Sequence, residues 1–194
     1  MSKETHEEKD NKVFPFIEGE MIDLVVPDLK WVELACRWEN DPEVRHYSRN
    51  AWPSTIEQIK KRFESATEEG IKTRVEFIIY HKQDKRPIGV LGFKNISWLN
   101  RNAEIFWTIG EREYWGRGIV VEAAKLVLTY AFTELNMHKI YAIILSPNAR
   151  SLRAAEKMGF TEEGVFKELV YIDGTWGDSH FYVISKREWC GEQK

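Results

Sequence analysis

The chain has 194 residues, a formal net charge of -3 at pH 7 and 43% hydrophobic residues. This apolar content excludes a fully disordered chain, and the mildly acidic balance gives no basic footprint for nucleic acid. Cys36 and Cys190 lie far apart. With no secretion signal and no apolar run long enough to cross a bilayer, we expect reduced thiols in a cytoplasmic protein that does not enter the membrane.

The N-terminal region predicts a tail followed by a strand and a helix. Residues 1–12 contain no aliphatic side chain after Met1, so we expect a disordered tail, with residues 13–194 forming a single domain. An apolar run over residues 21–26 predicts a strand, and Asp28 can cap a helix that runs to about Trp38.

The next segment predicts a second long helix before the chain turns to strands. Pro42 favours a short turn or helix at its own position. Ser54-Thr55-Ile56-Glu57 fits a capping box, and the helix behind it should end at Gly70. Further elements are expected from periodicity and turn residues: strands over 74–81, 87–97 and 103–110, a helix over 118–135, a strand over 139–145, a helix over 149–157, and strands over 161–172 and 179–185.

A glycine loop joins the strand over 103–110 to the helix that follows it. Its sequence is Tyr114-Trp115-Gly116-Arg117-Gly118. Two glycines between a strand and a helix N-terminus let several backbone N–H groups turn toward one anion, and the helix dipole favours negative charge there. The loop therefore predicts a pyrophosphate site. The sequence lacks the longer glycine fingerprint of dinucleotide sites and the Gly-Lys-Ser/Thr of ATP sites.

The run from Glu104 through Ala124, together with Asn148 and with Met158-Gly159-Phe160, resembles the GNAT acyltransferases. It is most similar to the branch that holds ribosomal-protein N-terminal acetyltransferases and spermidine N-acetyltransferases. The resemblance implies an α+β, three-layer fold. Its mixed, mostly antiparallel sheet of about seven strands, flanked by about four helices, would splay between strands 103–110 and 139–145.

The resemblance implies acetyl-CoA as the donor and a primary amine as the acceptor. The residues expected to contact coenzyme A are Trp107, Thr108, Ile109, Tyr114, Trp115, Gly116, Arg117, Gly118, Ile119, Val120, Asn148 and Ser151. A backbone N–H near Ile109 is the natural oxyanion donor. Asn148 suits either the pantetheine arm or a helix N-cap, which Asn fills well.

The catalytic candidates are Glu104 and Ser151. A carboxylate at the edge of the splayed strands could take the proton of the amine through water or hold the ammonium group, although Glu104 could equally be an outward-facing strand residue. Many family members place a Tyr at the position of Ala155 to protonate the departing thiolate. Ala155 cannot do this. The resemblance to the ribosomal-protein branch, through its Asn-x-x-Ser pattern, implies Ser151 as the acid, unless Ser151 only caps its helix or is solvated.

His46, Tyr47, Trp52 and Glu104 are the candidates for the acceptor pocket, although the aromatic residues among them could simply pack in the core. The five histidines are scattered and none pairs with a cysteine, so we expect no metal site.

Three functions stay open: an N-acetyltransferase for a protein N-terminus, the same chemistry on a polyamine or an amine-bearing drug, and a non-catalytic acyl-CoA sensor. Transfer should be direct, in a ternary complex, because no Cys lies near the loop to carry the acetyl group. A homodimer is compatible with these expectations.

Overall fold

The computed structural model describes residues 13–48 and 52–192. The tail expected over residues 1–12 lies outside the described residues. One mixed sheet dominates the fold, in the order β1-β2-β3-β4-β5-β6-β8-β7. Its strands are β1 Pro15–Glu18, β2 Ile22–Val25, β3 Val75–His81, β4 Arg86–Ser97, β5 Asn102–Ile109, β6 Lys139–Leu145, β7 Thr161–Ile172 and β8 Thr175–Ser185.

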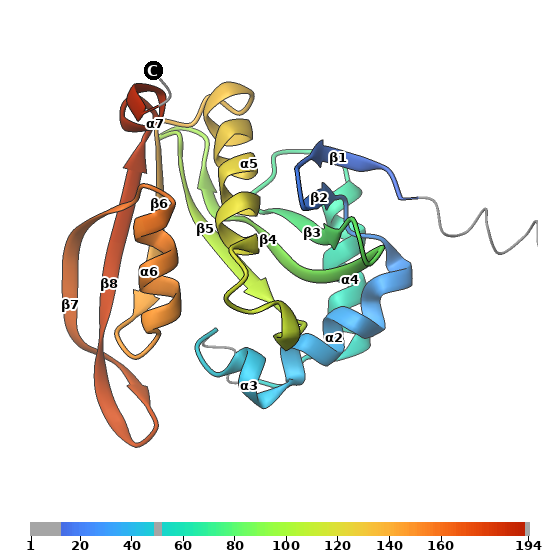
Figure 1. Ribbon diagram of the computed structural model, residues 1–194, viewed down its shortest axis with the longest axis horizontal. Helices are drawn as coiled ribbons and strands as arrows, with labels where there is room; N and C mark the ends of the chain where they lie inside the picture. The colour runs from blue at the N-terminus through green and yellow to red at the C-terminus, as the bar shows by residue number, and fades with distance from the viewer. Residues whose placement is uncertain (1–12, 49–51, 193–194) are drawn as a thin grey trace, which may run out of the picture.

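Helices cover both faces of the sheet and make three layers (Figure 1). They are α2 Val32–Asn40, α3 Pro42–Arg45, α4 Ile56–Thr67, α5 Ile119–Thr133, α6 Ala149–Lys157 and α7 Lys186–Glu192, with short 3-10 turns η1 Leu29–Trp31 and η2 Arg112–Tyr114. Helices α5 and α6 lie on one face, and α2 and α4 lie on the other.

The two faces have separate apolar cores. On the α5 side, Val127 and Leu128 pack with strand residues such as Leu91 and Phe93. On the other side, Trp38 of α2 and Phe63 of α4 pack over Ile78 of β3. Burial of these apolar side chains from both faces stabilises the sheet between its two helical layers.

Strands β5 and β6 form the parallel pair of the sheet, and they separate after a short contact. Their paired positions are Asn102 with Lys139, Ala103 with Ile140 and Glu104 with Tyr141. Each strand keeps its outer neighbour: β5 pairs with β4 as far as Ile109, and β6 pairs with β8 along its whole length. The gap that opens beyond Glu104 is visible between β5 and β6 (Figure 1).

This architecture confirms the predicted mixed, mostly antiparallel sheet that splays between residues 103–110 and 139–145. The largest differences from the expectation are in three elements: β1 and α7 were not predicted, and β8 begins at Thr175 rather than at residue 179. Strand β1 has four residues, with the sequence PFIE, and α7 is a polar segment with the sequence KREWCGE. Neither is long or apolar enough to show a periodic pattern.

The capping box of α4 was predicted one residue too early. Thr55 is the N-cap, and its side chain and that of Gln58 satisfy each other's backbone N–H groups. Ser54 is engaged elsewhere: its hydroxyl donates to Glu39 Oε2 at 2.6 Å, and its N–H donates to Asn40 Oδ1 at 3.0 Å. The contact with α2 therefore moves the helix start to the next hydroxyl residue.

Candidate active site

Two cavities meet at the gap between β5 and β6. The central cavity, about 510 Å³, lies between α2, α3, α4 and the strands β3 to β6. The loop cavity, about 420 Å³, lies between the glycine loop and α6. The residues that line both cavities are Val44, Tyr47, Ser48, Trp107, Thr108, Asn148 and Ser151. The two cavities thus share a junction where a molecule in one can meet a molecule in the other.

The glycine loop has the conformation that an anion cradle needs. Gly116 and Gly118 have φ of 78° and 80°, and a Cβ built on either would have nothing within 4 Å. Within the part of the chain that the structure describes, the backbone N–H groups of Gly116, Arg117 and Gly118 donate to no backbone carbonyl. The loop lines the loop cavity at the start of α5, and a cavity wall with open space at its glycines and with unpaired N–H groups fits a diphosphate.

Three contacts fix the loop against its surroundings. The Tyr114 hydroxyl donates to Asp84, and Trp115 Nε1 donates to Ile109 O at 2.8 Å. The Arg150 guanidinium lies 3.9 Å from the centre of the Trp115 ring, a distance at which cation–π attraction is significant. Burial and the bond to Asp84 raise the pKa of Tyr114, so its hydroxyl stays protonated as a donor. The loop is therefore held by β5 and by α6 at once.

The walls of the loop cavity carry an excess of positive charge. Besides Arg117, the cations Arg150, Arg153 and Lys157 of α6 line it, facing the single carboxylate Glu43. Sequence reasoning missed the three α6 cations. They recur at helical spacing on the expected helix over 149–157, and that spacing was the signal that could have found them.

The inner edge of β5 presents backbone groups to the gap. Gly110 N–H donates to Ile88 O of β4 at 2.9 Å. Because backbone groups of successive strand residues point to opposite sides, those of Ile109 and Trp107 face the gap. The Ile109 carbonyl accepts the Trp115 bond on this side, which leaves the Ile109 N–H directed toward the opening.

Asn148 and Ser151 lie together at the start of α6. Asn148 Oδ1 accepts the Ser151 N–H at 3.1 Å as an N-cap, and both residues line the junction. The capping role of Asn148 uses its oxygen, so its amide NH₂ is left for a ligand. Ala155 is fully buried, which places the family's usual Tyr position inside the core of this chain.

Glu104 lies where the two strands separate, and it is already paired. It is 7% exposed; Lys94 Nζ is 2.9 Å from its Oε1, and Asn95 Nδ2 donates to its Oε2 at 2.9 Å. Burial, and then the charge of Glu104, raise the pKa of the neighbouring Tyr141. The carboxylate lines the central cavity, but both of its oxygens have partners within the chain.

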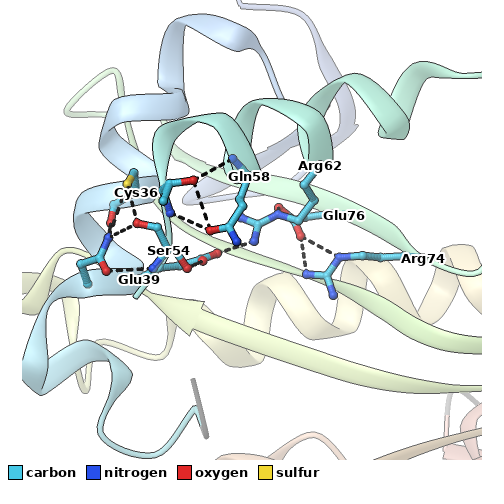
Figure 2. A network of polar contacts seen from close by, with 9 residues as sticks. Cys36, Glu39, Ser54, Gln58, Arg62, Arg74 and Glu76 are labelled. Carbon is cyan, nitrogen blue, oxygen red and sulfur yellow. Dashed lines mark hydrogen bonds and ion pairs between the residues drawn. The ribbon is translucent and has the colours of Figure 1, made fainter. Parts of the chain in front are cut away.

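A chain of alternating charges forms another wall of the central cavity (Figure 2). Glu39 accepts from Ser54 and pairs with Arg62, and Arg74 Nε donates to Glu76 Oε2 at 3.0 Å. Arg62 Nε lies 3.4 Å from Glu76 Oε1, and neither of these buried atoms has a hydrogen bond. Including Lys94, Glu104 and Arg45, four cations and three carboxylates line this cavity.

The three aromatic candidates for the acceptor pocket are placed differently. Tyr47 lines both cavities. His46 stacks edge-on against Tyr47 with ring centres 4.4 Å apart, and its Nε2 lies 3.1 Å from Asp173 Oδ2 at the tip of the β7–β8 hairpin. Trp52 is 82% exposed and is not among the lining residues of either cavity. Of the three, only Tyr47 lines the cavities, and His46 contacts the Tyr47 ring without lining either cavity.

Over residues 13–48 and 52–192, no group of three or more His, Cys, Asp or Glu side chains is placed to hold a metal ion. No helix in the same ranges is long and apolar enough to cross a membrane.

Comparison with known proteins identifies the family. The model of the acetyltransferase (GNAT) domain matches residues 25–161. The putative ribosomal N-acetyltransferase YdaF of Bacillus subtilis is 35% identical over 105 residues, 54% of this chain and 57% of that protein. Spermidine N(1)-acetyltransferase of Escherichia coli is 32% identical over 111 residues, 57% of this chain and 59% of that protein.

A solved structure shares the fold. Spermidine N-acetyltransferase from Vibrio cholerae, in complex with CoA and spermine, superimposes with a TM-score of 0.79 at 23% identity, covering 88% of this chain and 98% of that chain. The cradle, the parted strands and the family match agree, and the chain belongs to the GNAT family of acetyltransferases.

Proposed function

We propose that this acetyltransferase acts on an α-amine, such as a peptide N-terminus, by direct attack in a ternary complex. The observation that carries the proposal is the pairing of each carboxylate that lines the central cavity. Glu39 is engaged by Arg62, Glu76 by Arg74, and Glu104 by Lys94 and Asn95. A carboxylate held by a cation is a poor acceptor for the proton of an ammonium group.

The acceptor amine must be neutral before it can attack. An α-amine has a pKa of about 7.7–8.0, so roughly a quarter to two fifths of it is neutral at pH 7.5. A lysine-like or polyamine nitrogen, with a pKa near ~10.4, is neutral in about one molecule in a thousand. A site without a free base therefore favours the α-amine, because the lower pKa of its ammonium group leaves more of it neutral.

The donor side follows from the loop and from the edge of β5. When bound, acetyl-CoA supplies an acetyl group activated as a thioester. Gly116, Arg117 and Gly118 would hold its diphosphate, with the α6 cations around it. The backbone of Trp107 and Ile109 would pair with the pantetheine amides as a neighbouring strand would. The Ile109 N–H is our proposed donor to the negative charge that develops on the thioester oxygen.

Four hydroxyl side chains, those of Tyr47, Ser48, Thr108 and Ser151, line the junction of the two cavities, where the thiolate would depart. We assign the proton donor to Ser151, which the N-cap of α6 holds in place. The demand on this residue is small, because a thiol with a pKa near ~8.5 leaves partly as the thiolate at slightly basic pH. Replacing Ser151 by Ala should therefore cost less than replacing a general base.

A polyamine acceptor is the second candidate, and the similarity to spermidine N(1)-acetyltransferase favours it. The charges of the central cavity disfavour a polyamine acceptor. Its four cations and three carboxylates leave it without the negative charge that would attract a polycation.

A panel of acceptors separates the two candidates. The matched pair is a short lysine-containing peptide with a free N-terminus and the same peptide with the N-terminus blocked; spermidine is the third acceptor. In a thiol-release assay, kcat/KM for the free N-terminus should exceed that for the blocked peptide by about 200- to 300-fold at pH 7.5, following the neutral fractions of the two amines. Equal or better turnover of spermidine would overturn the α-amine proposal.

Glu104→Gln tests whether the paired carboxylate acts as a base. Because Lys94 and Asn95 already occupy it, we expect kcat to fall by about ten-fold or less, with acetyl-CoA affinity unchanged; a general base contributes 10²–10⁴-fold. Initial rates across pH provide the measurement, and Lys94→Met is the matched control for the broken pair. A loss above 100-fold together with the disappearance of the acidic limb would identify Glu104 as the base instead.

Gly116→Ala tests the cradle, and Gly174→Ala is its control. Both glycines have φ of 78° and open space where a Cβ would stand, so each variant should lose about 1–2 kcal/mol of stability through left-handed backbone strain. Only Gly116→Ala places a methyl group in front of the loop. Calorimetry should show weaker acetyl-CoA binding by about ten-fold or more for this variant alone. Equal affinities for the two variants would place the diphosphate elsewhere.

A further inference from the structure

Glu111 is a buried carboxylate outside both cavities, two residues beyond the end of β5. It is 9% exposed, and three donors converge on it. Its Oε1 accepts from Arg37 Nη2 at 2.6 Å and from Trp38 Nε1 at 2.7 Å. Its Oε2 accepts from Arg86 of β4. Burial would raise the pKa of Glu111, but the Trp38 bond and the charges of Arg86 and Arg37 outweigh it and lower the pKa.

The main chain of Glu111 is fixed as firmly as its side chain. The N–H groups of Gly110 and Glu111 both donate to Ile88 O, at 2.9 and 3.1 Å, and Tyr114 N–H donates to Glu111 O at 3.1 Å. The residue therefore joins the end of β5 to η2 and the glycine loop. These are the two parts of the chain that hold the donor.

Trp38, which Glu111 binds, is a wall of the central cavity. It lies on α2 and is 3% exposed. Its indole ring lies directly against Gly110, since a Cβ added there would be 2.1 Å from Trp38 Cγ. Two contacts therefore fix the ring relative to the end of β5. It packs against Gly110, and its Nε1 donates a hydrogen bond to Glu111.

We infer that Glu111 is a positioning residue that holds Trp38, and with it α2, in register with the donor strand. A charge-assisted hydrogen bond is short and directional, and a small displacement of reacting groups costs much of the rate. Through this contact, the position of Trp38 in the wall of the acceptor cavity is fixed relative to the end of β5 and the glycine loop, which are proposed to bind acetyl-CoA. The inference holds for any amine acceptor and does not depend on the α-amine proposal.

Trp38→Phe removes the indole N–H and keeps an aromatic ring against Gly110. We expect kcat/KM for the amine to fall roughly ten-fold, the scale of one hydrogen bond to a charged group, with the Kd for acetyl-CoA unchanged. Arg37→Gln is the matched control. It removes a donor to the same Oε1 from a side chain that lines neither cavity, so it should lower the melting temperature without changing the amine kinetics.

Glu111→Gln and Glu111→Ala complete the test. Gln retains an oxygen that can accept from Trp38, so it should keep kcat/KM for the amine closer to the wild-type value than Ala does, while both lose thermal stability. Two results would overturn the inference: unchanged amine kinetics in folded Trp38→Phe, or an equal loss in Arg37→Gln. The latter would mean that the cluster only stabilises the fold. Amine turnover by the wild-type enzyme, measured in parallel, tests the activity itself separately.

Discussion

The site depends on two parallel strands that pair briefly and then separate. Unpaired backbone groups inside a sheet are costly, and here the cost is limited because each strand keeps its other neighbour. Strand β5 stays paired with β4 as far as Ile109, and β6 stays paired with β8 as far as Leu145. Beyond Glu104, each strand therefore has a paired outer edge and an inner edge whose main-chain groups are not paired with the other strand. Such an edge can bind an extended ligand as an added strand.

The two cavities that meet at this gap differ in charge. The loop cavity is cationic and suits phosphates. Around the central cavity, each of the three carboxylates is paired with a cation: Glu39 with Arg62, Glu76 with Arg74 and Glu104 with Lys94. Breaking a buried pair leaves an uncompensated charge, so the Arg62–Glu76–Arg74 group resists rearrangement when a substrate enters. The cavity offers a fixed shape with its carboxylates already engaged, and the proposed preference for a neutral α-amine rests on this engagement.

The sequence was most informative where a single pattern determines the element. The bounds of the strands over 139–145 and 161–172 and of the helix over 149–157 were predicted as the structure has them. Turn residues mark these ends: Ser146-Pro147 follows the first strand, Gly159 follows the helix, and Asp173-Gly174 follows the second strand. The glycine loop was located because its chemistry is local. The pairing of Glu104 with Lys94 was not predictable, since it depends on the register of β4 against β5. The Glu111–Trp38 contact joins residues far apart in the chain and left no signal in either segment.

Hydrogen exchange at the edge of β5, with and without coenzyme A, tests the central claim most directly. If the pantetheine pairs along this edge, the amides of Trp107 and Ile109 should exchange at least about ten-fold more slowly in the complex. The amide of Thr108, which faces β4 opposite Val90, should change little and serves as an internal reference. Unchanged exchange at Trp107 and Ile109, in a sample that calorimetry shows to be saturated with coenzyme A, would contradict the account.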